Sequence, residues 1–141
     1  MTSSPGASVS QGDMPERIYE WFSALAGRAE PVNAAELRSM WTEDCVIVAN
    51  GEVKCTGIAA LVRHFEEVRA KLLSWTVHLP IPIRVAQNDC VAVHYRVDFV
   101  PLHGSPGRAL VNAFVDLHQG KVSRLTEIVH FEGAQLHLEN H

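Results

Sequence analysis

The sequence contains no apolar run long enough to cross a membrane and no cluster of basic residues. A membrane-spanning helix needs about 20 consecutive apolar residues, and a nucleic-acid-binding surface needs concentrated Lys and Arg. Across the 141 residues, 12 basic residues are outnumbered by 16 acidic ones, and the formal net charge is -4. We therefore expect neither a membrane nor a nucleic acid as a partner.

Cysteine is scarce, with Cys45, Cys55 and Cys90 the only examples and no C-x-x-C pair. An odd number with this spacing matches neither a disulfide framework nor a zinc knuckle. Reduced, partly buried thiols are typical of cytoplasmic proteins. The first dozen residues also lack the basic start and apolar run of a secretory signal. The sequence therefore predicts a cytoplasmic protein.

Sequence motifs for cofactors, metals and nucleophiles are absent as well. The chain has no G-x-S-x-G elbow, and the loop at residues 104–107 lacks the lysine of a phosphate-binding loop. His94 and Asp98 share one strand face, as do Asp116 and His118, but a metal ion needs several converging ligands. We expect no cofactor and no metal.

The chain divides into one domain between two polar ends. Residues 1–12 are rich in Ser, Gly and Pro and predict a flexible tail, and residues 134–141 form a polar C-terminal tail. The length suits a single hydrophobic core, and no internal repeat is visible. We assign residues 13–133 to one domain.

Helical patterns dominate the first half of this domain. Asp13 and Glu16 have the spacing of a capping box before a helix that ends near Gly27, and Asn33 and Glu36 repeat the spacing before a shorter helix. Residues 45–49 predict a strand, and Asn-Gly at 50–51 predicts a hairpin that returns to about residue 56. An apolar stripe then predicts a long helix over residues 58–72.

After Ser74 the apolar period changes from helical to alternating. The pattern predicts strands at about 75–86, 90–100, 109–118 and 121–131, with tight turns at 87–89 and 119–120. Three helices before a run of long antiparallel strands define an α+β fold. We expect a curved antiparallel sheet wrapped round the helices as a cone, in the order α-α-β-β-α-β-β-β-β, with a ligand pocket at the centre.

The register of the last hairpin follows from its turn. Counting back from a two-residue loop at Gln119-Gly120 gives a set of cross-strand pairs: His118–Lys121, Asp116–Ser123, Phe114–Leu125 and Asn112–Glu127. These residues would share one face of the sheet.

The strand CVAVHYRVDFV has one apolar and one polar face. The polar face carries His94, Arg96 and Asp98, and the apolar face carries Val91, Val93, Tyr95, Val97 and Phe99. Two arrangements fit this pattern. Either the apolar face packs on the helices and the polar triplet meets solvent, or the apolar face is the outer one and the triplet lines the cavity.

The element order, with WTEDCVIVANG before the long helix and GKVSRLTEIVHF at the end, resembles the nuclear transport factor 2 (NTF2)-like superfamily. This superfamily, whose fold is cystatin-like, includes the SnoaL-like polyketide cyclases, the ketosteroid isomerases and the limonene epoxide hydrolases. The resemblance covers about residues 15–131, and it specifies the fold far better than the chemistry.

The stretch YRVDFVPLHGSPG is similar to the Arg-x-Asp strand and following loop of limonene epoxide hydrolase. The resemblance implies that Arg96 and Asp98 face inward and that Glu127 occupies the position of that family's second acid. Two carboxylates around one guanidinium can separate into an acid, here Asp98, and a base, here Glu127, while Arg96 holds and polarises the substrate. The tyrosine and asparagine that orient water in that family fall on Ile47 and Ala49.

Ketosteroid isomerase gives a second comparison. Asp116 falls on that family's protonated aspartic acid, the tyrosine partner falls on Trp21, and the catalytic base falls on Ala49. Asp116 is then either a pocket acid or a solvent-facing aspartate beside a turn.

These observations predict a cofactor-independent acid/base enzyme, a hydrolase, isomerase or lyase, acting on a small hydrophobic metabolite. Epoxide hydrolysis is the most specific candidate, with Arg96, Asp98 and Glu127 as the catalytic residues. The predicted pocket comprises Trp21, Phe65, His94, Val100, Asn112, Phe114, Asp116 and Val129.

Two alternatives remain open at this point. One is a non-catalytic ligand-binding or dimerisation module of the same fold, in which Arg96 and Asp98 form a structural ion pair. The other is a protein-recognition module that uses the apolar outer face of the sheet. In an enzyme or a binder we expect a homodimer through that outer face, formed by Val93, Tyr95, Val97 and Phe99.

Overall fold

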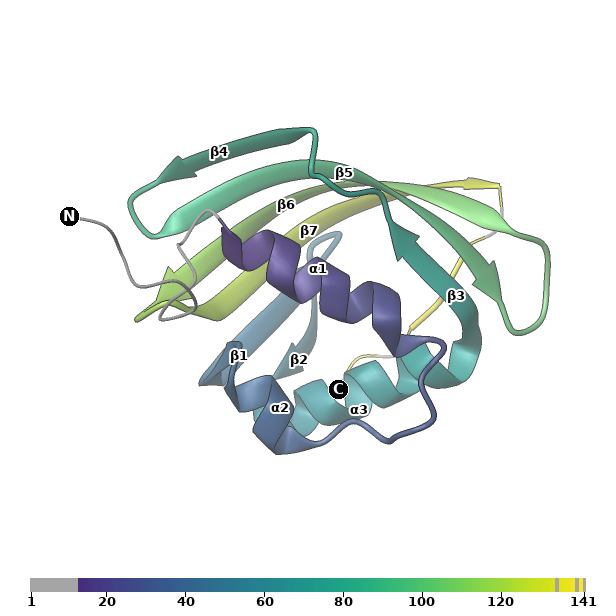
Figure 1. Ribbon diagram of the computed structural model, residues 1–141, viewed down its shortest axis with the longest axis horizontal. Coiled ribbons are helices and arrows are strands. Elements are labelled where there is room, and N and C mark those ends of the chain that lie inside the picture. The colour runs from purple at the N-terminus through teal and green to yellow at the C-terminus, as the bar shows by residue number, and fades with distance from the viewer. Residues whose placement is uncertain (1–12, 134, 139, 141) are drawn as a thin grey trace.

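The structure is a computed structural model that describes residues 13–133, 135–138 and 140 (Figure 1). The tail predicted at residues 1–12 lies outside the described residues. No helix in the described part of the chain is long and apolar enough to cross a membrane.

Three helices lie on the concave side of one curved sheet (Figure 1). The elements follow in the order α1 (Met14–Leu25), α2 (Ala34–Arg38), β1 (Trp41–Ala49), β2 (Glu52–Thr56), α3 (Ile58–Lys71), β3 (Leu72–Val77), β4 (Ile83–Gln87), β5 (Cys90–Pro101), β6 (Gly107–His118) and β7 (Lys121–Gly133). This is the α+β cone that the sequence predicts, except that β1 runs parallel to β7 in a sheet expected to be antiparallel.

The two predicted capping boxes have different outcomes. At α2 the box is confirmed: the Glu36 backbone amide donates to Asn33 Oδ1 at 2.9 Å, and the Asn33 amide donates to Glu36 Oε2 at 3.1 Å. At α1 it is wrong, because the side chain of Asp13 makes no capping hydrogen bond. Asp13 instead lies 4.0 Å from the Arg84 guanidinium.

The strands form one sheet in the order β2-β1-β7-β6-β5-β3, with β4 also paired to β5. Within the described residues the sheet has seven strands, one more than predicted, because the segment expected as a single strand at 75–86 is interrupted between Val77 and Ile83. Pro80 and Pro82 fall in this gap, and proline has no amide hydrogen to donate to a sheet. Both β3 and β4 pair with β5, so the interruption lets the chain continue along the same neighbour.

The predicted Asn-Gly hairpin is confirmed and is anchored to the sheet. Asn50 and Gly51 both have positive φ angles, of 50° and 83°, which suit a two-residue hairpin turn. The side chain of Asn50 accepts from the Val129 amide at 2.8 Å and donates to the Val129 carbonyl at 3.2 Å. The turn between β1 and β2 is thereby fixed against β7.

The apolar face of β5 lies inside the cone, as in the first of the two arrangements. Val91, Val93, Tyr95, Val97 and Phe99 are all buried and belong to the main core. The polar triplet therefore lies on the outer face, and the prediction that it lines the cavity is wrong. The homodimer interface expected from Val93, Tyr95, Val97 and Phe99 is wrong for the same reason, because these side chains pack within their own subunit.

A β-bulge changes the register of the last hairpin. His118 pairs with Lys121 as predicted, but Asp116 pairs with Arg124, so Ser123 is an extra residue on β7. Its hydroxyl donates to the Asp116 carbonyl at 3.2 Å. A shift of one residue moves every later side chain to the opposite face.

The bulge changes the face of the sheet on which Glu127 lies. Glu127 lies opposite Ala113, where the two-residue turn alone predicted Asn112. Ala113 is buried on the inner face, whereas Asn112 and Phe114 are exposed on the outer one. The prediction that Glu127 shares a face with Asn112, Phe114 and Asp116 is therefore wrong.

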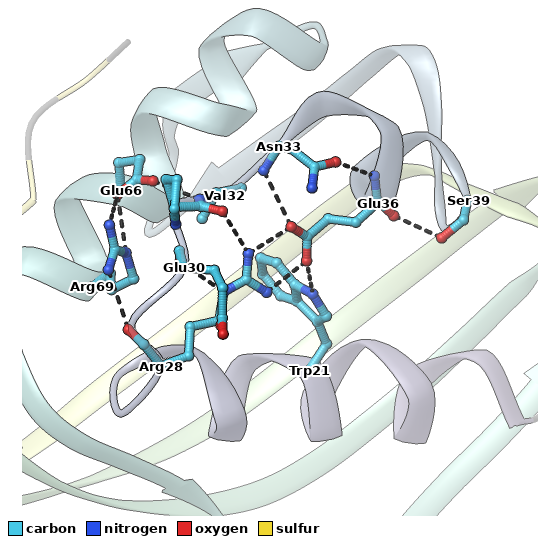
Figure 2. Close-up of polar contacts among 10 residues, drawn as sticks. Trp21, Arg28, Glu30, Val32, Asn33, Glu36, Ser39, Glu66 and Arg69 are labelled. Atoms are coloured by element: carbon cyan, nitrogen blue, oxygen red, sulfur yellow. Dashed lines mark hydrogen bonds and ion pairs between the residues drawn. The ribbon is translucent and has the colours of Figure 1, made fainter.

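A cluster of charged side chains fastens the loop between α1 and α2 (Figure 2). The Glu36 carboxylate accepts from both terminal nitrogens of Arg28, at 2.6 and 2.5 Å, and from Trp21 Nε1 at 2.7 Å. The Arg28 guanidinium lowers the pKa of Glu36 to about 2. On the other side of the loop, the Val32 amide donates to Glu66 Oε1 on α3 at 2.6 Å. The cluster ties α1, α2 and α3 together on the concave side of the sheet.

Candidate functional site

A cavity of about 500 Å³ lies between the concave face of the sheet and the helices α1 and α3. This volume lies in the range of about 300–1,000 Å³ that is usual for small-molecule sites. Its walls are largely apolar and aromatic, and they include Phe22, Leu25, Ile47, Phe65, Val68, Trp75, Val111, Val129 and Phe131.

Two carboxylates of the described residues border the cavity: that of Glu52, on β2, is exposed to solvent, whereas that of Glu127 lies among the apolar walls. Its neighbours across the sheet are Ala49 on β1 and Ala113 on β6. Because alanine carries only a methyl group, the two neighbours leave room beside the carboxylate that larger side chains would fill. The Tyr95 hydroxyl, on β5, donates to Glu127 Oε2 at 3.2 Å.

The environment of Glu127 changes its acidity. Burial raises the pKa of Glu127 to about 7, and the hydrogen bond from Tyr95 acts weakly in the opposite direction. The side chain keeps some accessible surface, but that surface opens onto the cavity, so loss of hydration dominates. An acid with a pKa near 7 can both accept and donate a proton at neutral pH.

Tyr19 of α1 lies directly behind Tyr95. The two ring centroids are 4.3 Å apart, and both side chains are buried. Burial, together with the nearby Glu127, raises the pKa of each phenol well above its usual value, so both hydroxyls stay protonated. The Tyr19 hydroxyl adjoins that of Tyr95 but completes no hydrogen bond of normal geometry with the described residues.

His64 of α3 is a further titratable side chain in the buried part of the wall. It is buried and packs edge-on against Phe65, with ring centroids 5.1 Å apart. Sequence reasoning missed both His64 and Tyr95 as site residues. His64 is three residues after Leu61 and thus falls on the buried stripe of the helix, and Tyr95 alternates with buried valines, so periodicity contained the signal for both.

The predicted pocket residues separate into two groups. Phe65 and Val129 line the cavity, as does Glu127, which was predicted as a catalytic residue. Trp21 packs against Phe65 with ring centroids 4.9 Å apart and donates to Glu36, so it supports the wall from behind.

The other predicted pocket residues lie outside the cavity. His94, Asn112, Phe114 and Asp116 lie on the outer face of the sheet, where His94 Nδ1 is 2.7 Å from Asn112 Oδ1. Val100 borders a separate shallow surface cleft. The prediction that these five side chains face the pocket is wrong.

The predicted cluster of Arg96, Asp98 and Glu127 does not form. Arg96 is exposed on the outer face, and Asp98 binds His78 Nε2 at 2.5 Å and Arg108 Nε at 3.4 Å there. His78 and, to a smaller extent, Arg108 lower the pKa of Asp98. The sheet itself separates this outer cluster from Glu127. The predicted three-residue site is wrong because alternation directs Arg96 and Asp98 outward and the bulge turns Glu127 inward.

No protein-family model matches this sequence, and no curated protein matches it. Solved structures do match its fold. An uncharacterized cystatin-fold protein from Novosphingobium aromaticivorans aligns with a TM-score of 0.69 and 18% identity over 86% of this chain and 99% of that one. An NTF2-like protein from Anabaena variabilis aligns with a TM-score of 0.66 and 16% identity over 95% and 96%.

A SnoaL-like polyketide cyclase from Agrobacterium tumefaciens also aligns, with a TM-score of 0.65 and 15% identity over 86% of this chain and 92% of that one. Likeness at these identities defines architecture and leaves chemistry to the site. The chain therefore has the NTF2-like, cystatin-like α+β fold predicted from its sequence, and its cone encloses a largely apolar pocket in which Glu127 is the less exposed of two bordering carboxylates.

Proposed function

We propose that this protein is a cofactor-independent acid/base enzyme that takes up a small hydrophobic molecule, with Glu127 as the group that moves the proton. One observation carries the proposal: Glu127 lies among the apolar walls of the cavity, and burial raises its pKa to about 7, whereas the other bordering carboxylate, Glu52, is exposed to solvent. Perturbed acids in a cleft are characteristic of sites that transfer protons.

The chemistry available to one carboxylate favours some reactions over others. Glu127 can remove a proton from one carbon of a ligand and return it to another, which is what an isomerase or a cyclase requires. Epoxide hydrolysis needs both a base for water and an acid for the epoxide oxygen. Because Asp98 is on the outer face, that acid would have to be another wall group such as His64. We therefore place isomerisation and cyclisation ahead of epoxide hydrolysis.

The test is a proton-exchange assay. Apolar cyclic ketones are incubated with the protein in D₂O, and deuterium incorporation next to the carbonyl is followed by NMR; terpene epoxides are assayed in parallel for diol formation. Glu127→Gln should slow exchange by roughly 10²–10⁴-fold, the usual contribution of a positioned general base. Asp98→Asn is the matched control and should leave the rate unchanged. Equal rates in wild type and Glu127→Gln would reject the proposed role of Glu127.

A non-catalytic ligand-binding protein is the alternative outcome of the same experiment. Neutral Glu127 could donate a hydrogen bond to a ligand carbonyl without any transfer of protons to carbon. Saturable binding of the ketones with no exchange and no diol formation would favour this function over catalysis.

We also propose that two copies associate through the outer face of the sheet. Four exposed apolar side chains, Ile83, Val85, Phe114 and Ile128, form the outer patch, each between 55% and 62% exposed. Cross-strand pairing places Ile83 and Ile128 in one row, and Val85 and Phe114 in the adjacent row. His94 and Asn112 lie between Ile83 and Ile128 in their row, and Ala92 lies between Val85 and Phe114. Large exposed apolar side chains gathered on one face of a sheet are characteristic of an interface.

Charges of both signs border the outer patch, with Asp116 paired to Arg124 across β6 and β7. A second copy related by a twofold axis could therefore match apolar with apolar and acid with base. Phe114→Lys should convert a dimer to a monomer in sedimentation velocity, whereas Leu102→Lys, an exposed apolar residue of the β5–β6 loop, should not. A wild-type monomer at high concentration would contradict the dimer.

The state of the cysteines supports a cytoplasmic location as part of this proposal. Cys45 and Cys55 are buried free thiols, and burial raises their pKa values to about 11 and about 12. Protonated, free thiols persist most readily in a reducing compartment.

A further inference from the structure

We propose that residues 135–138 form a strap across the mouth of the pocket, and that Lys54 and Lys71 hold the strap closed and so control the entry of ligand. The inference deepens the proposed function, because it concerns access to the same cavity. Figure 1 shows the yellow end of the chain leaving β7 and returning toward α3.

The strap forms part of the cavity wall. Gln135, Leu136, His137 and Leu138 all border the cavity that contains Glu127, and Leu136 also packs against the main hydrophobic core. These four residues follow the last strand and have no regular secondary structure of their own. A wall built from such a segment can move without any strand leaving the sheet.

Two lysines donate hydrogen bonds to the backbone of the strap. Lys71, at the end of α3, donates from Nζ to the His137 carbonyl at 2.9 Å. Lys54, on β2, donates from Nζ to the Leu138 carbonyl at 3.3 Å and to Asn140 Oδ1 at 3.0 Å. The segment is thereby fixed to two consecutive elements, β2 and α3, whose lysines lie 84 and 66 positions before the carbonyls that they bind.

Each lysine is oriented by a carboxylate of its own element. Lys71 Nζ lies 2.9 Å from Glu67 Oε2, one helical turn earlier, and Lys54 Nζ lies 3.4 Å from Glu52 Oε2. These pairs remain when the strap opens, so an opened strap leaves neither ammonium group without a partner. The strap atoms that accept from the two lysines are the carbonyl oxygens of His137 and Leu138. Water can donate hydrogen bonds to these oxygens once the segment is exposed. Opening therefore exchanges the lysine contacts for hydration, and it also withdraws Leu136 from its packing against the core.

The strap also affects the acid that the proposed function uses. Glu127 and the strap border the same cavity, and burial is the main cause of the raised pKa of Glu127. Opening the strap admits water, and water restores hydration to the carboxylate. We therefore expect the pKa of Glu127 to fall toward its ordinary value when the lysine contacts are removed.

The experiment measures how fast a neutral dye enters the pocket. Nile red is mixed with wild type and with the Lys54→Met, Lys71→Met double variant, and the rise in fluorescence is followed by stopped flow. Methionine keeps the length of the side chain and removes its charge. Loss of the charge-assisted hydrogen bonds should increase the association rate by about tenfold or more. Lys121→Met, at the first residue of β7, is the matched control and should behave as wild type.

The outcomes separate the strap from the proposed catalysis. An association rate in the double variant within about twofold of wild type would overturn the proposal that the strap controls entry. Failure of the dye to bind the double variant at all would also overturn it, because an open apolar cavity of about 500 Å³ should accept the dye. A second readout needs no dye: the carboxyl ¹³C shift of Glu127, titrated by NMR, should show a lower pKa in the double variant. Neither measurement depends on turnover, so the strap can hold even where the exchange assay rejects Glu127 as a catalytic base.

Discussion

Replacing Glu127 with Gln should stabilise the protein at alkaline pH, although the same change should abolish proton transfer. Burial raises the pKa of Glu127 from 4.5 to about 7. The folded state therefore binds a proton more tightly than the unfolded state does. Below about pH 4.5 the carboxyl is protonated in both the folded and the unfolded state, and it costs no stability. As the pH rises through 7, ionisation of the buried carboxyl lowers the free energy of unfolding.

The size of this effect follows from the shift. A difference of about 2.5 pH units corresponds to at most about 3 kcal/mol, and water in the cavity relieves part of that, which leaves about 1.5–3 kcal/mol. Gln has the shape of the protonated acid and its carbonyl can still accept from Tyr95. For a chain of this length the gain should raise Tm by about 5–10 °C at pH 8.

The assay is thermal unfolding of wild type and Glu127→Gln, followed by circular dichroism at pH 5 and pH 8. The difference in Tm should be small at pH 5 and large at pH 8. Glu132→Gln, an exposed position on the same strand, is the matched control and should show no such gain. A Glu127→Gln variant that is no more stable than wild type at pH 8 would refute the conclusion that this carboxyl is desolvated in the empty pocket.

Three further predictions concern the surroundings of the site. Tyr95→Phe removes the hydrogen-bond donor to Glu127 and should raise the pKa of that carboxyl further. The pH profile of the exchange rate should then shift to higher pH, and an unchanged profile would contradict this prediction. Glu36→Gln should lower the free energy of unfolding by about 1–2 kcal/mol at pH 7, measured by urea unfolding. Because Arg28 lowers the pKa of Glu36 to about 2, this difference should be fully present above about pH 4.5 and should shrink as the pH falls toward 2. A difference that does not depend on pH would count against the ion pair. Asp98→Asn should change stability by less than about 1 kcal/mol, since the His78 and Arg108 contacts are half-exposed, and a larger loss would mean that the outer cluster has a structural role.

Periodicity and local turn chemistry were sufficient to predict most of the elements. The Asn33–Glu36 capping box, the Asn50-Gly51 hairpin and the apolar stripe of α3 each depend on contacts within a few residues, and all three are confirmed. The predicted capping box of α1 was wrong because it ignored a contact that is distant in the sequence. Asp13 lies near Arg84, more than seventy positions later, and no local pattern can anticipate that partner.

The site depended on information that is not local. The alternation of β5 defined two faces, but only the packing of the helices determined that Tyr95 and its apolar neighbours lie inside and that Arg96 and Asp98 lie outside. The direction of Glu127 depended on one extra residue, Ser123, whose bulge has no distinctive sequence and reverses the face of every residue after it. The sequence by itself thus determined the elements and the curved α+β cone, because helix and strand periodicity are properties of neighbouring residues. Tertiary structure alone decided which carboxylate occupies the pocket, because that choice depends on strand register and on which face of the sheet the helices cover.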